Sequence, residues 1–299
     1  MIYTGRGMGD NLRALAAGEV DVAIATPASF AAFAQRGVGP FEGNPLSNLV
    51  AIAALPHWDA MVPVARRELG LHSLADVATF EGPLRVSLGA NDPDGFMGLA
   101  GDILLGVAGV SEVDIIARGG KVTRHEQPFD VIADLHEGRA DLMISEAIMT
   151  SDWQALARGD VEFLTLTPEQ IDALDAQWGL RTRDIPAGYF AGTSPAIRAL
   201  DYSDWLIATT TALPDDVAEL LARAVVDDSE YLARTYRHLP VEYSPLHYPI
   251  DYRLARETAL PLHPAVARVY DSADAQTAAG QNTAPQHAAE QNDEAREVA

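Results

Sequence analysis

The sequence predicts an α/β fold in which two similar lobes face each other across a cleft. Two segments carry the same pattern, namely a helix-period stretch, then Gly-x-x-Asp, then an apolar run, then a hydroxyl residue. The first covers residues 11–26 and the second covers residues 129–145. A glycine just past a helix ends it in the left-handed conformation, and a continuous apolar run is typical of a strand buried on both faces. Each copy therefore predicts one helix and one strand, and the pair predicts two lobes.

The residues that end the two repeats are candidate ligand contacts. Thr26 and Ser145 each follow an apolar run, and Glu146 comes directly after the second one. Open α/β sheets bind ligands at the carboxyl ends of their strands. We therefore expect Thr26 at the cleft, while both a ligand contact and ordinary surface exposure fit Glu146.

In the first third of the chain, caps and apolar runs mark the expected elements. Asp10 or Asn11 can cap the first helix, Gly37 ends the second, and Ser73 can cap a short one. The expected helices cover residues 11–17, 28–35, 72–77 and about 96–107. The expected strands cover residues 20–25, 49–55, 60–64, 84–88 and 113–116.

The rest of the chain continues the alternation, which predicts parallel sheets. Helices are expected at 128–137, 153–156, 168–177, from Pro214, and at 261–270, with strands at 140–144, 161–166 and 205–208. The Pro- and Gly-rich stretch 182–200 is predicted to be a loop that crosses between lobes. The predicted first lobe is 1–80 plus 203–271, the second is 81–202, and 272–299 is a disordered acidic tail.

Composition narrows the function. The 299 residues carry a formal net charge of −22 and no cysteine. Strong acidity argues against nucleic acid and anionic membranes as partners, and the absence of cysteine excludes disulfides and thiol chemistry. No apolar run approaches the ~20 residues of a membrane span. No signal peptide follows Met1, so the chain as written is expected to stay in the cytoplasm.

Motifs for catalysis and cofactors are missing from the sequence. The stretch TGRGMG (residues 4–9) lacks the Gly-Lys-Ser/Thr ending of a phosphate loop, and no zinc-type histidine spacing or Gly-x-Ser-x-Gly elbow occurs. We therefore predict no cofactor, no metal and no assigned catalytic residue. The sequence Arg124-His125-Glu126 fits either a small proton-transfer site or a solvated loop.

Four blocks of the sequence resemble one family of binding proteins. GRGMGDNLRALAAGEVDVAIAT, RVSLGANDPDGFMGLAGDILLGVAGV, FDVIADLHEGRADLMI and LPLHPAVARVYDS occur in the order typical of the TAXI family. Members of that family are solute-binding subunits of tripartite ATP-independent periplasmic (TRAP) transporters. The resemblance covers residues 2–271. It implies a periplasmic-binding-protein type II-like fold that closes on a small organic solute, often a carboxylate, and hands it to a membrane permease.

The same resemblance suggests that the chain is N-terminally truncated. Family members carry a signal peptide, a first strand and a first helix before the point at which this chain starts. We therefore expect an extracytoplasmic protein if those segments belong to it, and a cytoplasmic one if Met1 is the true start. A decayed fragment without function is a third interpretation.

The candidate ligand residues come from the loops that this resemblance places at the cleft. Thr4, Met8 and Asn11 lie in the first block, and Tyr189 lies in an IPAGY stretch similar to a cleft loop of the family. Asn91, Asp92 and Asp94 stand where the family usually has Ser-Gly-Thr. The two aspartates either cap the following helix or indicate a different ligand, which would be cationic, neutral and polar, or metal-bridged.

The leading hypothesis is capture of a small polar organic solute, a carboxylate or an amino acid, for a TRAP-type permease. The alternative is a cytoplasmic enzyme, such as a decarboxylase or hydratase, on the same fold. In that case Asp92 and Asp94, with Glu146 opposite, would act as paired carboxylates that supply a general acid.

Overall fold

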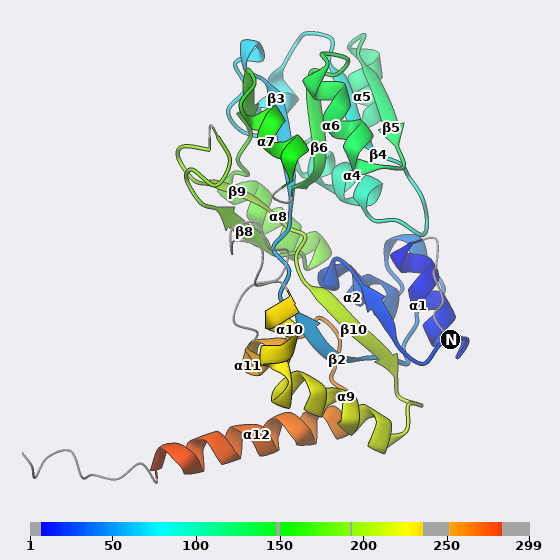
Figure 1. The fold of residues 1–299 in the computed structure, drawn as a ribbon. Coiled ribbons are helices and arrows are strands. Elements are labelled where there is room, and N and C mark those ends of the chain that lie inside the picture. Colours follow the sequence, from blue (N-terminus) through cyan, green and yellow to red (C-terminus); the bar gives the residue numbers. More distant parts are fainter. Residues whose placement is uncertain (1–6, 148–149, 192, 236–250, 283–299) are drawn as a thin grey trace, which may run out of the picture.

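The computed structural model describes residues 7–147, 150–191, 193–235 and 251–282. These residues form two α/β lobes, each built on its own sheet, one above the other in Figure 1. The predicted fold class, two α/β lobes of the periplasmic-binding-protein type, is confirmed. Within the described ranges, no helix combines the length and apolar character that crossing a bilayer requires.

The first lobe contains a three-stranded sheet in the order β1-β10-β2. Its strands are β1 (Ala23–Ala25), β10 (Trp205–Thr210) and β2 (Leu49–Leu55), and β10 is antiparallel to both neighbours. The helices of this lobe are α1 (Met8–Ala16), α2 (Ala28–Arg36), α9 (Asp215–Asp227), α10 (Ser229–Thr235), α11 (Tyr252–Ala255) and α12 (Pro264–Asn282). Figure 1 shows α9 and α12 together on the side away from the second lobe.

The second lobe contains a seven-stranded sheet in the order β5-β4-β6-β3-β9-β8, with β7 paired to β3. The strands are β3 (Ala60–Arg66), β4 (Arg85–Gly89), β5 (Lys121–His125), β6 (Leu142–Ala147), β7 (Val161–Phe163), β8 (Thr182–Ile185) and β9 (Ile197–Asp201). The helices are α3 (Asp76–Thr79), α4 (Met97–Val107), α5 (Glu112–Ala117), α6 (Pro128–His136), α7 (Ser151–Ala157) and α8 (Pro168–Trp178). Two short 3-10 turns cover Gly39–Phe41 and Arg67–Leu69.

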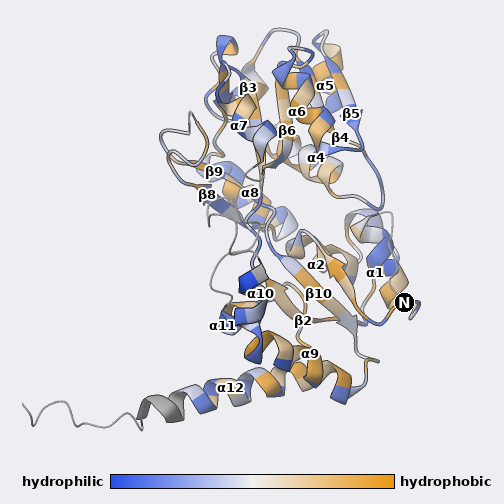
Figure 2. Cartoon of the chain, viewed as in Figure 1, coloured by the Kyte–Doolittle hydropathy of each residue, from blue (hydrophilic) through white to orange (hydrophobic). Residues whose placement is uncertain are grey.

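Local sequence explains most of these elements. Thr167 and Gln170 form a capping box at the start of α8, and Gly179 ends that helix in the left-handed conformation. Gly37 ends α2 in the same way. Strands β2 and β3 are almost wholly buried, as their continuous apolar runs predict. The edge strand β5 is hydrophilic by contrast, as Figure 2 shows, and this suits its exposure at the end of the sheet.

Within the residues that the structure describes, the chain crosses between the lobes twice, once between β2 and β3 at residues 56–59 and again between β9 and β10 at residues 202–204. Residues 60–80 therefore belong with the second lobe, although the sequence placed them in the first. The reason is that β3 pairs with β6, β7 and β9, all of which lie in the larger sheet.

Four other expectations are corrected. The larger sheet is mixed, with only the pairs β4–β5 and β4–β6 parallel, and the smaller sheet is antiparallel because the returning strand β10 runs against both of its neighbours. Residues 113–116 lie in the helix α5, begun by a Ser111–Asp114 capping box. The stretch 182–200 contains the antiparallel pair β8–β9. Helix α12 continues to Asn282, past the point where a disordered tail was expected.

Aromatic side chains join the lobes. Phe30 in α2 packs edge-on against Phe96, which precedes α4, with ring centroids 4.8 Å apart. Both rings belong to a buried apolar cluster that contains residues of both lobes. Burial of this surface favours the arrangement in which the lobes are in contact.

Candidate functional site

The two crossings bring a buried carboxyl group to the junction of the lobes. Asp59 is the last residue before β3, and Tyr202 follows β9. The Tyr202 N–H donates a hydrogen bond of 3.3 Å to the Asp59 carbonyl, which ties the crossings together. The Asp59 side chain is fully buried, and neither carboxyl oxygen has a hydrogen-bond partner among the described residues. A buried, unpaired carboxyl group is costly, which makes it a functional candidate.

A second acid lies beside it. Glu146 pairs with Met61 in the β3–β6 register, and Asp59 stands two positions before Met61, so both carboxyl groups lie on the same face of the sheet. Glu146 is half-buried, and its carbonyl accepts a 2.8 Å hydrogen bond from Trp153 Nε1. Burial raises the pKa of Asp59 well above its ordinary value, and the Glu146 carboxyl group raises it further.

An arginine and two aromatic rings border the acids. Arg183 in β8 donates a 3.2 Å hydrogen bond to the Asp59 carbonyl, and its guanidinium lies 4.7 Å from the Trp58 ring centroid. The other ring, that of Tyr189, stacks on Trp58 with centroids 4.2 Å apart. The Arg183 charge lowers the pKa of Asp59, but only as the smallest of the contributions, since the guanidinium also lies 3.7 Å from the Asp201 carboxylate.

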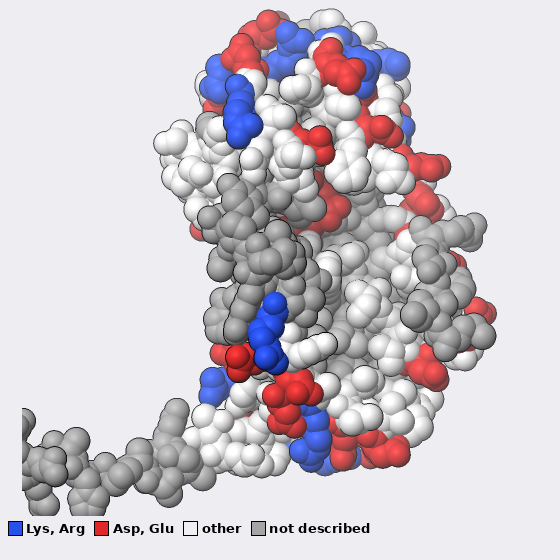
Figure 3. Space-filling view, viewed as in Figure 1, with Lys and Arg blue, Asp and Glu red and all other residues white. Residues whose placement is uncertain are grey.

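We refer to Asp59, Glu146, Arg183, Tyr189 and Tyr202 as the crossing cluster. Burial raises the pKa of Tyr189 to about 12 and raises the pKa of Tyr202 well above its ordinary value, with the negative charges of Glu146 and Asp59 adding to the effect at Tyr202. Both phenols therefore stay protonated at neutral pH and remain hydrogen-bond donors. Figure 3 shows acidic side chains at the level where the lobes meet on the face in view.

Ser145, which precedes Glu146 in β6, also has a buried polar atom without a hydrogen-bond partner among the described residues. The Ser145 hydroxyl is fully buried and has no hydrogen-bond partner among the described residues, and the same holds for Arg183 Nε. Native proteins satisfy most buried polar atoms. Ser145 alternates with Glu146 along β6 and therefore faces the other side of the sheet. Arg183 Nε, and not the Ser145 hydroxyl, joins the Asp59 oxygens in a site that water or a polar ligand can complete.

The predicted residues of the loop after β4 have a different role from the expected one. Asp94 forms an ion pair with Arg13 of α1, and its carbonyl accepts a 3.0 Å hydrogen bond from the Gly9 N–H. Asp92 accepts a 2.9 Å hydrogen bond from the Asp94 N–H, and Asn91 accepts one of 3.1 Å from Arg124. Neither aspartate caps α4, whose N-cap is Phe96 without a side-chain bond. The capping expectation is therefore wrong, because the loop reaches across to the first lobe instead.

The remaining predicted residues are spread over the first lobe. Met8 is buried at the start of α1, Asn11 is half-buried in that helix, and Thr26 is exposed after β1. Thr4 lies outside the described residues. Of the nine predicted residues, the structure thus brings Glu146 and Tyr189 to Asp59, and it brings Met8 close to the loop that contains Asn91, Asp92 and Asp94.

The sequence Arg124-His125-Glu126, a candidate proton-transfer site, makes contacts within the second lobe instead. Arg124 is paired with Asp102 at 2.7 Å and Glu112 at 2.6 Å. His125 Nε2 lies 2.6 Å from the carboxylate of Asp134. Burial works against ionisation of Asp134, but hydrogen bonds from His125, Arg139 and Ser87 outweigh it and lower its pKa. Glu126 is exposed. These contacts hold elements of the second lobe together, so Arg124 and His125 are engaged within the protein rather than with a ligand.

Sequence reasoning missed Asp59 and Arg183. The available signal was a carboxylate inside an otherwise apolar run, LPHWDAMVPVA, between two buried strands. Charged residues are almost never fully buried unless they are paired, so an aspartate in such a run is informative. Its neighbour Glu146, however, is distant in sequence, and only strand pairing reveals the pair.

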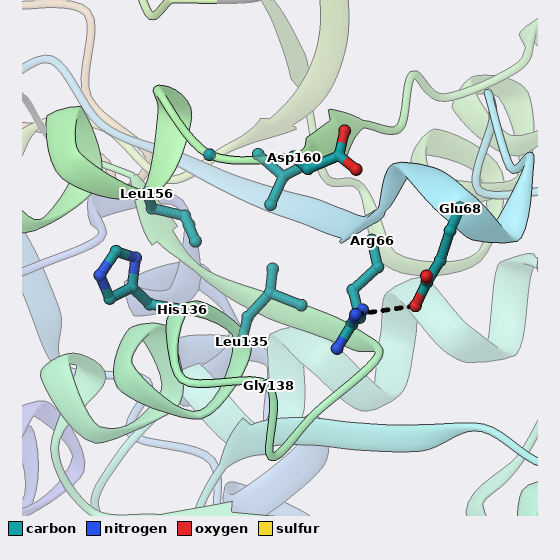
Figure 4. A pocket seen from close by; sticks show the side chains of 9 residues that line it. Arg66, Glu68, Leu135, His136, Gly138, Leu156 and Asp160 are labelled. Carbon is teal, nitrogen blue, oxygen red and sulfur yellow. Dashed lines mark ion pairs between the residues drawn. The ribbon is translucent and has the colours of Figure 1, made fainter.

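The cavities in the described part of the chain include three at separate places. One of about 390 Å³ opens at the crossings, where Arg183, Asp201 and His57 are among its lining residues. Another of about 540 Å³ lies between α2 and the segment after α11. A third of about 180 Å³ is shown in Figure 4 at the outer part of the second lobe, where an Arg66–Glu68 ion pair of 2.8 Å borders it. No group of three His, Asp or Glu side chains suited to a metal occurs among the described residues.

Two α/β lobes connected by paired crossings, with polar groups gathered at the junction, define a fold of the periplasmic-binding-protein type. The chain belongs to the NMT1-like family, whose model matches residues 2–273. No curated protein sequence matches it significantly.

Solved structures are similar to this chain at low sequence identity. A Xanthomonas citri protein bound to ATP is 12% identical with a TM-score of 0.51, and the alignment covers 91% of this chain and 86% of that one. An R. palustris protein with adipate is 14% identical with a TM-score of 0.44, covering 92% and 82%. A structure described as a periplasmic transporter is 14% identical with a TM-score of 0.46, covering 93% and 84%. The first of these supports the fold assignment.

Proposed function

We propose that this protein is an extracytoplasmic solute-binding protein that captures a small polar organic solute, a carboxylate or an amino acid, between its two lobes. The observation that carries the proposal is the unpaired, buried carboxyl group of Asp59 beside Glu146, at the point where both crossings pass between the lobes. Lobes joined by two short crossings can close on a ligand by a hinge motion.

The proposed contacts follow from this geometry. Glu146 and Tyr189 are the half-buried members of the crossing cluster that were predicted from the sequence, and Arg183 adds a positive charge at the same place. Met8, Asn11 and Thr26 remain proposed contacts from the first lobe. Asp94 is not proposed as a contact, since Arg13 already pairs with it.

The proposed partner is a TRAP-type membrane permease, and the four sequence blocks similar to the TAXI family support it. A solute-binding protein of this type delivers its solute and leaves it chemically unchanged. Reconstitution with the permease subunits in vesicles is the direct test, because uptake that depends on the added protein is required by this assignment.

The alternative function, an enzyme on the same fold, is favoured by one specific observation. A carboxyl group whose pKa is raised by burial and by a second carboxyl group is suited to act as a general acid. The pair is Asp59 and Glu146 rather than the predicted Asp92 and Asp94 with Glu146, since Asp94 is bound to Arg13.

A binding screen separates the two functions. Purified protein is melted in the presence of organic acids, amino acids, amines and sugars, because a ligand that binds only the folded state raises the melting temperature. Each positive mixture is then analysed by mass spectrometry after an hour. An unchanged ligand is the expected result, consumption would establish the enzyme, and a cooperative melt that no compound shifts would refute solute binding.

A pair of matched variants tests whether the solute binds at the crossing cluster. We expect Glu146→Gln to change the affinity for the solute at least tenfold, since it removes a negative charge at the proposed contact; the affinity falls for a solute whose ammonium group lies there and rises for a carboxylate. Glu126→Gln is the control, because Glu126 is an exposed acid in the same lobe. Equal affinities for the two variants would show that the crossing cluster is not the site.

A further inference from the structure

Asp59 and Glu146 together carry more negative charge than their surroundings neutralise. The charged and titratable groups that act on Asp59 are Glu146 from β6, Arg183 from β8, Tyr189 from the segment between β8 and β9, and Tyr202 from the second crossing. Arg183 is the one cation in this set, and the carboxylate of Asp201 shares it.

The hydrogen bonds of Arg183 show that its charge is not directed at the Asp59 carboxyl group. Its terminal nitrogen donates to the Asp59 carbonyl, and the guanidinium lies over the Trp58 ring. No donor among the described residues is in hydrogen-bond geometry with either carboxyl oxygen of Asp59. Two adjacent acids in a poorly hydrated place require either a proton or a bound cation between them.

Resting on the proposed function, we propose that the captured solute carries a protonated amine, and that this ammonium group binds between Asp59 and Glu146 in place of a proton that the pair holds in the empty protein. An ammonium group offers three donors and no acceptor, which suits the two Asp59 carboxyl oxygens, since no donor among the described residues is in hydrogen-bond geometry with either of them. A simple carboxylate would instead meet two acids of its own sign.

The exchange balances in charge. The empty pair holds one proton and one negative charge, and binding of one ammonium group releases that proton to solvent. Release is complete where the empty pair is protonated and falls to zero at a pH where both acids are already ionised. Burial and the Glu146 carboxyl group raise the pKa of Asp59, which extends the range over which a proton is held.

A divalent metal ion is a less suitable occupant. Among the described residues no third His, Asp or Glu joins the pair to form a coordination shell. Calcium typically takes six to eight oxygen ligands, and two carboxyl groups provide few of them. Calcium alone is therefore included in the test as a competing probe.

The test is calorimetric titration of the full chain with putrescine, L-lysine, succinate and calcium, in two buffers whose protonation enthalpies differ. We expect an amine to bind with release of up to one proton and with an affinity that rises by up to about tenfold per pH unit while the pair is protonated. Asp59→Asn and Glu146→Gln should each weaken amine binding at least tenfold and abolish the proton release. Glu126→Gln should leave both unchanged.

The failures of the two proposals are distinguishable. Binding of succinate without any amine, binding of calcium at the pair, or amine binding with no proton release would overturn the ammonium inference while solute binding stands. A cooperative melt with no binding of any organic probe would instead count against the proposed function itself. If Asp59→Asn does not fold, the Glu146→Gln variant and the proton release of the unmodified protein decide the question.

Discussion

The ion pair between Arg13 and Asp94 joins the two lobes on the side of α1. Arg13 belongs to α1 of the first lobe, and Asp94 lies in the loop that precedes α4 of the second. Arg13 also lies 4.7 Å from the Phe41 ring centroid, and its guanidinium donates to the carbonyls of Pro40 and Pro93. The contact therefore acts as a latch between lobes that the two crossings connect elsewhere.

Removal of this latch should loosen the loop without unfolding either lobe. We expect Arg13→Ala to speed hydrogen exchange of the Gly9 N–H, which bonds to the Asp94 carbonyl, by about three- to tenfold, since a partly exposed ion pair is worth up to ~1 kcal/mol. Amide exchange followed by mass spectrometry measures this directly.

The control is an ion pair of similar exposure within one lobe. Arg85 and Asp141 pair inside the second lobe, with Nε and Oδ2 2.9 Å apart. Arg85→Ala should lower the melting temperature but leave exchange at Gly9 unchanged. Equal acceleration by the two variants would mean that the Arg13 contact is not a latch.

The glycines of the α1 entrance allow the loop to approach this closely. A Cβ atom on Gly7 would lie 2.2 Å from the Asp94 carbonyl oxygen, which no side chain can tolerate. We expect Gly7→Ala to push the loop away and increase the radius of gyration measured by small-angle scattering. Gly106→Ala is the matched control, because nothing lies within 4 Å of its Cβ position in α4, and it should stabilise the protein by up to about 1 kcal/mol.

This role of the glycines shows where sequence reasoning stops. The sequence block that contains TGRGMG was predicted to contribute ligand contacts, yet Gly7 and Gly9 make room for a backbone from the other lobe. A glycine pattern reveals that something approaches closely but not what it is. The helices α2 and α8 were predicted well, because their caps and apolar spacing are local signals.

The features that the sequence did not predict share one physical cause, namely that they depend on contacts between distant segments of the chain. The β8–β9 pair was hidden because its stability comes from pairing across the sheet, while its connecting segment is rich in Pro and Gly. Glu146 was predicted from its place after a strand, which the repeated pattern encodes. Asp59 was not, because its significance depends on burial and on a neighbour brought by β6.

The Arg124 network should be structural rather than a binding site. Arg124→Ala would leave Asp102 and Glu112 without their shared cation and would release the loop at Asn91. We expect a loss of about 1–3 kcal/mol in the free energy of unfolding, typical of leaving charged partners unsatisfied. Glu126→Ala, at an exposed neighbour, should change it by less than about 0.5 kcal/mol. Chemical denaturation measures both, and a stable Arg124→Ala protein would reopen this place as a site.

The raised pKa of Asp59 predicts that stability falls as pH rises. The folded protein keeps this proton to a higher pH than the unfolded chain does, so the group's favourable contribution is complete below about pH 3.9 and is lost as pH rises through the folded pKa. Asp59→Asn cannot ionise and should escape that loss. Relative to the unmodified protein, its melting temperature should therefore improve between pH 4 and pH 8.

We expect the melting temperature to improve by at least ~2 °C. For a protein of about 250 residues this corresponds to about 1 kcal/mol in the free energy of unfolding. Asp92→Asn is the control, since Asp92 is exposed, and its curve should run parallel to that of the unmodified protein. The same Asp59→Asn variant should bind amines poorly. A gain in stability with a loss of binding is what a strained functional site produces, whereas melting curves that stay parallel across the pH range would show that Asp59 is not destabilised by its charge.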